Sequence, residues 1–226
     1  AALDLKCEES LKSNISKFAH LLEGVPSARR YEEVLKLFLT GSAVKVLNQL
    51  ISYDVLRYLL PGTAKSLKDK ESGHQSLKFI NLSLNNSDER VKNDLPLTPA
   101  FLFSVLLWPS LVKRIGEVQS HKSKIPALRT AANLILKQQY SHCFIPNRIE
   151  NMIKEIWEMQ IRLLRTDSSK ALDLLTNPRF RAAYDFLLLR EKLGVNLNKA
   201  GDWWTKAQAE NGVTKKKFSK QRPKYR

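Results

Sequence analysis

The sequence predicts an all-α fold, a multi-helix bundle followed by a disordered basic C-terminal tail. Apolar residues recur with helical spacing along most of the 226 residues, and no segment alternates convincingly as a β-strand does. Only 8 glycines and 9 prolines are present, too few for the many tight turns of a sandwich or barrel. The length is sufficient for one substantial core or two small ones.

The first part of the chain predicts three amphipathic helices. Gly24 and Pro26 end the first helix, Ser27 caps the second, and Gly41 ends the second. Each helix has one apolar face that has to be buried against a neighbour. The three apolar stripes span residues 11–22, 31–39 and 44–51.

The middle of the chain contains a predicted loop and a predicted buried helix. Residues 55–60 form a short apolar segment, and residues 63–73 are polar and lysine-rich, which favours a loop. Residues 77–93 again show helical spacing. Residues 100–108 are apolar nearly all round, and a helix of that kind belongs in the middle of a bundle.

Further helices are predicted in the last part of the chain. The most regular one spans residues 146–165, a short one spans residues 171–175, and the final one carries Trp203 and Trp204. Adjacent tryptophans on a helix point in different directions, so we expect one in the core, with base stacking as the alternative for the other. Trp157 is expected in the core rather than as a base-stacking platform.

The segment that begins at Asn177 is the most informative part of the sequence. Pro178 suits the first position of a helix, and Asn177 can cap that start by accepting a backbone N–H. Arg179, Arg181 and Arg190 flank the apolar stripe that follows. From the spacing alone, these arginines favour a solvated helix face.

The net charge of +16 and the isoelectric point of about 9.9 indicate a polyanionic partner, either nucleic acid or an anionic membrane. No apolar run approaches the ~20 residues needed to span a bilayer, and no signal peptide is evident. Cys7 and Cys143 belong to no motif, which is typical of small buried hydrophobes in a reducing compartment. The histidines show no metal-ligand spacing, so we expect a cytoplasmic protein without a metal site.

The tail after residue 212 carries 7 of the +16 charges and no acid. It has too little apolar area to fold alone. Such an arm binds phosphates without regard to base sequence, and a solubilising role is the alternative. Its basic residues are Lys215, Lys216, Lys217, Lys220, Arg222, Lys224 and Arg226.

Two segments resemble bacterial poly(A) polymerases, which are relatives of the CCA-adding enzymes. The string NPRFRAAYDFLLLRE, starting at Asn177, resembles the arginine-framed helix near the C-terminus of that family. The string VPSARRYEEVLK, residues 25–36, resembles its neck-helix motif Arg-x-x-x-Glu-x-x-Lys. The resemblance implies that Arg29, Glu33 and Lys36 brace the neck against the nucleotide-binding region, whereas their spacing alone favours a surface ion-pair ladder.

The resemblance covers nearly all of the chain but only the C-terminal half of the family's architecture. It implies a neck over residues 1–62, a helical body over residues 63–212 and a tail over residues 213–226. The superfamily holds two Mg²⁺ ions with an Asp-x-Asp motif on a strand, and this sequence contains no Asp-x-Asp. We therefore expect ATP and Mg²⁺ to bind in a catalytic head outside this chain, and we expect the chain alone to be inactive and free of cofactors.

The expected function is RNA binding in the neck and body of an enzyme that adds AMP from ATP to RNA 3′ ends. Arg179, Arg181, Arg190 and the basic tail are the expected contacts with single-stranded RNA 3′ ends, and no membrane partner is expected. One alternative is an interaction module that docks a DEAD-box RNA helicase or another RNA-decay factor. Another is an active transferase that uses carboxylates supplied by a separate polypeptide.

Overall fold

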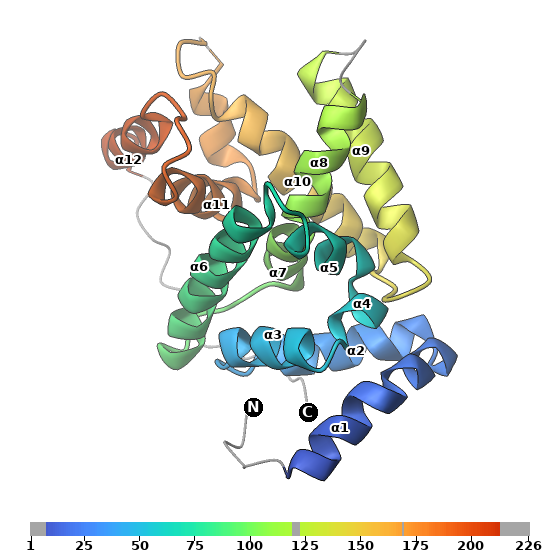
Figure 1. The fold of residues 1–226 in the computed structure, drawn as a ribbon. Helices are drawn as coiled ribbons and strands as arrows, with labels where there is room; N and C mark the ends of the chain where they lie inside the picture. The colour runs from blue at the N-terminus through green and yellow to red at the C-terminus, as the bar shows by residue number, and fades with distance from the viewer. Residues whose placement is uncertain (1–7, 119–122, 169, 213–226) are drawn as a thin grey trace.

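The computed structural model describes residues 8–118, 123–168 and 170–212, which form twelve α-helices and no strand (Figure 1). This confirms the predicted all-α fold. No helix within these ranges is long and apolar enough to cross a membrane. The predicted basic tail and Cys7 lie outside the described residues.

The helices follow one another through short connections. In chain order, the first are α1 (Glu9–Phe18), the 3₁₀ turn η1 (Ala19–Gly24), α2 (Ser27–Phe38), α3 (Ala43–Ser52), α4 (Leu56–Leu59), α5 (Pro61–Leu67) and α6 (Gly73–Lys92). They continue with α7 (Pro99–Leu106), α8 (Trp108–Val118), α9 (Lys124–Gln139), α10 (Asn147–Arg162), the 3₁₀ turn η3 (Leu172–Thr176), α11 (Phe180–Lys192) and α12 (Ala200–Glu210).

Helix α7 occupies the centre of the bundle, as its all-round apolar sequence predicted. It packs against α6, α8 and α10, and Figure 1 shows other helices on every side of it. Every residue from Ala100 to Leu106 is buried. The helix begins at Pro99, which needs no hydrogen-bond partner for its nitrogen, and the Thr98 hydroxyl accepts the N–H of Phe101.

The main hydrophobic core runs from α2 to α11. It crosses the predicted boundary between residues 62 and 63, which falls inside α5. Trp157 is fully buried in this core and donates its indole N–H to the Ser104 carbonyl at 3.0 Å, which confirms it as a core residue. The rings of Tyr31 and Phe103 stack at 5.5 Å between centroids and join α2 to α7.

A second, smaller core joins α10, α11 and α12. Trp204 is fully buried there, and its indole N–H donates to the Leu163 carbonyl at 2.8 Å. The ring of Trp204 meets that of Phe180 edge-on. Trp203 is only partly buried, so one tryptophan of the pair is a core residue, as predicted.

The predicted loop over residues 63–73 was wrong for residues 63–67, which belong to helix α5, whereas residues 68–72 form the connection to α6. Thr63 is buried, and its hydroxyl donates to the Leu106 carbonyl at 2.8 Å. Gly73 then starts α6 so close to α5 that a Cβ would lie 2.5 Å from the Leu67 carbonyl oxygen. Contacts with α7 and α8 stabilise a helix that is too short and polar to form alone.

Helix α11 begins at Phe180, later than the predicted start at Pro178. The Asn177 side chain does accept a backbone hydrogen bond, from the N–H of Arg179 at 2.8 Å. That bond closes an Asx turn in front of the helix instead of capping the helix itself. Local bonds of this kind compete with helix formation, which explains the later start.

The N-terminus of α3 is capped from a distant helix. The buried carboxylate of Asp88, on α6, accepts the backbone N–H of Ala43 at 2.8 Å and that of Val44 at 3.3 Å. These N–H groups have no partner within their own helix, and a negative charge is favourable at this end of the helix dipole. Asp88 therefore holds α3 and α6 together.

Replacing Asp88 with alanine leaves two N–H groups of α3 without their acceptor. We expect the free energy of unfolding to fall by about 1–3 kcal/mol, measured by urea denaturation. Asn85→Ala, an exposed change on the same helix, is the matched control and should leave stability nearly unchanged. An equal loss in both variants would contradict the capping role of Asp88.

Candidate nucleic-acid interface

The predicted bracing motif lies on the outer face of α2. Lys36 Nζ and Glu33 Oε1 are 2.9 Å apart, and both side chains are about half exposed. The hydrogen bond from Lys36, together with the charges of Lys36 and Arg29, lowers the pKa of Glu33. Val34 and Phe38, on the opposite face, are buried. This geometry is that of a surface ion-pair ladder, and the bracing role stays a prediction.

Arg30, which the sequence analysis did not single out, is the buried arginine of the same helix. Its guanidinium donates to the Ser141 carbonyl at 2.6 Å and to the Tyr58 carbonyl at 3.4 Å. It therefore joins α2 to α4 and to the connection between α9 and α10. The signal in the sequence was its helical phase, because Arg30, Val34 and Phe38 recur every four residues on the apolar stripe.

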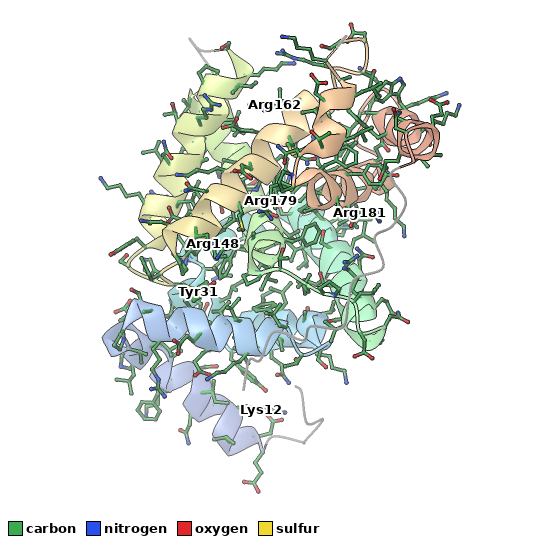
Figure 2. The ribbon with its side chains drawn as sticks, turned by 180° about the vertical axis from the view of Figure 1, so that it is seen from behind. Lys12, Tyr31, Arg148, Arg162, Arg179 and Arg181 are labelled. Atoms are coloured by element: carbon green, nitrogen blue, oxygen red, sulfur yellow. The ribbon has the colours of Figure 1, made fainter. Side chains whose placement is uncertain are left out.

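Arg179 and Arg181 lie at the start of α11 (Figure 2). Each has a carboxylate partner. Arg179 Nε is 3.4 Å from Glu155, and Arg181 Nη2 is 3.0 Å from Asp185. A phosphate would have to compete with these carboxylates, and RNA binding by the two arginines stays a prediction.

Arg190, near the C-terminal end of α11, is partly buried and makes different contacts. Its guanidinium is 5.0 Å from the centre of the Trp108 ring and donates to Gln160 Oε1 at 3.3 Å. Burial lowers the pKa of Arg190 to about 10, so it remains charged at neutral pH. The side chain packs between α8, α10 and α11, where the Trp108 ring holds the cation, and RNA binding by Arg190 stays a prediction.

Basic side chains from distant segments gather in an open groove between α4, α5 and α8, which we call the basic groove. Its volume is about 520 Å³. Arg57 comes from α4, Lys65 from α5 and Lys113 from α8, while Lys68 and Lys70 follow α5. The other lining residues are Pro61, Ala64 and Asp69.

Asp69 holds one of these cations in place. Its Oδ2 is 2.7 Å from Lys113 Nζ, and its Oδ1 accepts the backbone N–H and the hydroxyl of Ser72 at 3.0 and 2.9 Å. The hydrogen bond from Lys113, and then those from Ser72, hold the pKa of Asp69 far below its ordinary value. The same hydrogen bond raises the pKa of Lys113.

Asp54 orders two further cations of the basic groove. It lies 2.9 Å from Arg57 Nε and 3.4 Å from Lys68 Nζ. No ion pair within the described part of the chain engages Lys65 or Lys70. The groove is lined by five cations and one carboxylate, Asp69, and three further acids, Asp54, Glu71 and Glu117, act on its cations, so the basic groove keeps a net positive charge.

Two family models match the chain. Residues 4–67 match the model described as "Probable RNA and SrmB-binding site of polymerase A", and residues 120–226 match "Polymerase A arginine-rich C-terminus". The chain belongs to the bacterial poly(A) polymerase family. Arg57 and Lys65 of the basic groove lie in the first matched segment, Arg179 and Arg181 lie in the second, and Lys113 lies between them.

The chain is also similar to individual poly(A) polymerases. Poly(A) polymerase I of Salmonella typhi is 30% identical over 214 residues, 92% of this chain and 46% of its own length. That of Escherichia coli O157:H7 is 31% identical over 213 residues, 92% of this chain and 45% of its own length. That of Haemophilus influenzae is 30% identical over 219 residues, which are 94% of this chain and 47% of its own length. The chain spans about half the length of these relatives.

The Asp69 carboxylate should stay ionised well below its ordinary pKa of 3.8. Because the pKa is lowered in the folded state, the pairing stabilises the fold above pH 3.8, and this stabilisation is lost as the pH falls through the lower folded-state pKa. Carboxyl ¹³C chemical shifts followed through an acid titration measure the midpoint. In Lys113→Gln, the midpoint should rise toward 3.8, and an unchanged midpoint would show that Lys113 is not the main cause.

Proposed function

We propose that this chain is the RNA-binding part of a cytoplasmic poly(A) polymerase, and that its basic groove holds the phosphate backbone of single-stranded RNA. The observation that carries the proposal is the convergence of five basic side chains from three helices and a turn on one open groove. Family membership supports RNA as the polyanion, because the model matching residues 4–67 is described as an RNA-binding site.

The chemistry of the basic groove favours backbone contacts over base readout. Four of its five cations are lysines, which bind phosphates as point charges rather than through a fixed planar fork. Arg57 is the exception, and its guanidinium already covers the Tyr58 ring at 4.7 Å. Such contacts depend little on base sequence and release counterions, so binding should weaken steeply as salt is added.

The basic groove would serve the intact enzyme by holding RNA behind its 3′ end. In this proposal, AMP is added from ATP, with Mg²⁺, in a part of the enzyme outside these 226 residues. Arg179, Arg181 and the basic tail would add further phosphate contacts. Because the RNA is held at a distance from its end, its 3′ hydroxyl stays available to the catalytic part of the enzyme.

Neutralising the basic groove should weaken RNA binding and reduce its salt dependence. In the triple variant Lys65→Gln, Lys68→Gln, Lys70→Gln, the slope of log affinity against log salt concentration should fall by about 0.7 for each phosphate that the protein no longer neutralises. Fluorescence anisotropy with labelled single-stranded oligoadenylate at several salt concentrations measures both quantities.

The control for the triple variant carries the same change in net charge elsewhere. Lys78, Lys192 and Lys206 are exposed on α6, α11 and α12, outside the basic groove. Their combined replacement by Gln should change affinity and slope much less. Equal effects of the two triple variants would mean that net charge, rather than the basic groove, governs binding, and would overturn the proposal.

A second candidate function is docking of a protein partner through α1 and η1. Three large apolar side chains there are exposed: Leu11 by 53%, Phe18 by 49% and Leu21 by 61%. The stripe lies within residues 4–67, whose matching model is described as an SrmB-binding site as well as an RNA-binding site. An exposed apolar stripe of this kind typically marks a protein interaction surface. The description of the matching model favours the expected RNA helicase as the partner.

Replacing Phe18 and Leu21 with serine tests this second function. The double variant should lose binding to purified SrmB after nuclease treatment, while its affinity for oligoadenylate should stay unchanged, because these side chains carry no charge. Surface plasmon resonance with the immobilised protein measures both affinities. Retained helicase binding in the double variant would exclude α1 and η1 as the docking surface.

A further inference from the structure

A second groove, which we call the aromatic groove, lies between α9 and α10. Its volume is about 440 Å³, and a smaller hollow of about 250 Å³ shares Asn133 and Lys154 with it. Figure 2 shows Arg148 at the N-terminal end of α10, next to Asn147 in the lining. The lining residues are Asn133, Leu136, Lys137, Tyr140, Ser141, Asn147, Glu150 and Lys154.

We propose that the aromatic groove binds a base of the same single-stranded RNA, stacked on the ring of Tyr140. This inference rests on the proposed RNA binding at the basic groove and adds a contact of a different kind. The basic groove attracts phosphate charge, whereas an exposed aromatic ring offers a flat apolar face that every base can cover. The aromatic groove would therefore favour RNA over a polyanion that lacks bases.

The ring of Tyr140 is both exposed and held in position. The residue is 57% exposed at the end of α9, and its ring meets that of Phe144 edge-on at 5.0 Å between centroids. The backbone of Phe144 is anchored to α2 in turn, because its N–H donates to the Ser27 carbonyl at 3.1 Å. A base that stacks on a ring already held in place orders little further structure, which favours binding.

The side chains around Tyr140 suit a nucleotide. Lys137 and Lys154 supply positive charge for the phosphates beside a stacked base. The amides of Asn133 and Asn147 each offer a donor and an acceptor for the polar edge of a base. Glu150 is the acid in the lining, where burial raises its pKa and the charge of Lys154 opposes that rise.

The carboxylate of the smaller hollow is neutralised within the protein. Glu158 accepts two hydrogen bonds from Arg129, at 2.6 and 2.9 Å, and one from Arg162 at 3.2 Å. The hydrogen bond from Arg129 is the main reason that the pKa of Glu158 is lowered. Two guanidinium groups thus offset one carboxylate, which leaves this end of the groove attractive to phosphate.

The two grooves adjoin the same buried anchor. Arg30 donates to the carbonyl of Tyr58, which follows Arg57 of the basic groove, and to the carbonyl of Ser141, which lines the aromatic groove. Gln139, next to Tyr140, donates to the Leu59 carbonyl at 2.6 Å and ties α9 to α4 a second time. These contacts hold the two grooves in a fixed arrangement relative to each other.

Comparing Tyr140→Ala with Tyr140→Phe on two ligands tests the stacking. The ligands are single-stranded oligoadenylate and an abasic ribose-phosphate chain of the same length. Tyr140→Ala should bind oligoadenylate about tenfold more weakly, whereas Tyr140→Phe, which keeps the ring, should bind like the unchanged protein. Tyr140→Ala should bind the abasic chain as the unchanged protein does. Its salt slope should not change, because tyrosine carries no charge.

Leu95→Ala, which removes an exposed apolar side chain outside both grooves, provides the control, and it should not alter affinity for either ligand. The stacking proposal is overturned if Tyr140→Ala binds oligoadenylate normally. It is also overturned if Tyr140→Ala lowers the affinity for both ligands equally, because the abasic chain has no base to stack. If the lysine triple variant loses affinity while Tyr140→Ala does not, the stacking fails and the proposed function stands. If neither variant weakens binding, both proposals fail.

Discussion

The buried guanidinium of Arg30 is the contact on which the placement of both grooves depends. It bonds to carbonyls 28 and 111 residues away in the sequence, one in α4 and one between α9 and α10. A buried cation is costly when its donors lack partners. Separating these segments would leave both Nη groups of Arg30 unpaired, in addition to the buried Nε, which has no hydrogen-bond partner. Cys143 does not act as its counterion, because burial raises the pKa of that thiol to about 12 and keeps it neutral.

The distribution of charge explains why grooves, rather than helix faces, are the candidate binding surfaces. Many exposed cations lie beside an acid on the same helix, as Lys92 lies beside Glu89 and Arg114 beside Glu117. Such pairs contribute little to stability and also offset the local charge. The net positive charge is concentrated where separate helices bring together more cations than acids, as they do around Lys65 in the basic groove.

Helical periodicity predicted the elements well where a helix could show its own apolar face. The buried helix around Phe103 and the core position of Trp157 follow from such patterns. The prediction failed over residues 63–67, where the burial of Thr63 against α7 outweighs a polar local sequence. Periodicity also could not show the surroundings of Arg190, because the Trp108 ring that holds its guanidinium lies far away in the sequence and no spacing rule connects the two.

The sequence by itself determined the helical class, the strong basic character and, through the strings at residues 25–36 and from Asn177 onward, membership of the poly(A) polymerase family. Each of these properties is local or additive along the chain. Only the tertiary structure decided which charges converge. Lys113 meets Asp69 across 44 residues, and Arg30 turns inward while Arg29 stays outside. Contacts between separate helices depend on how those helices pack, and sequence spacing specifies neighbours only within one helix.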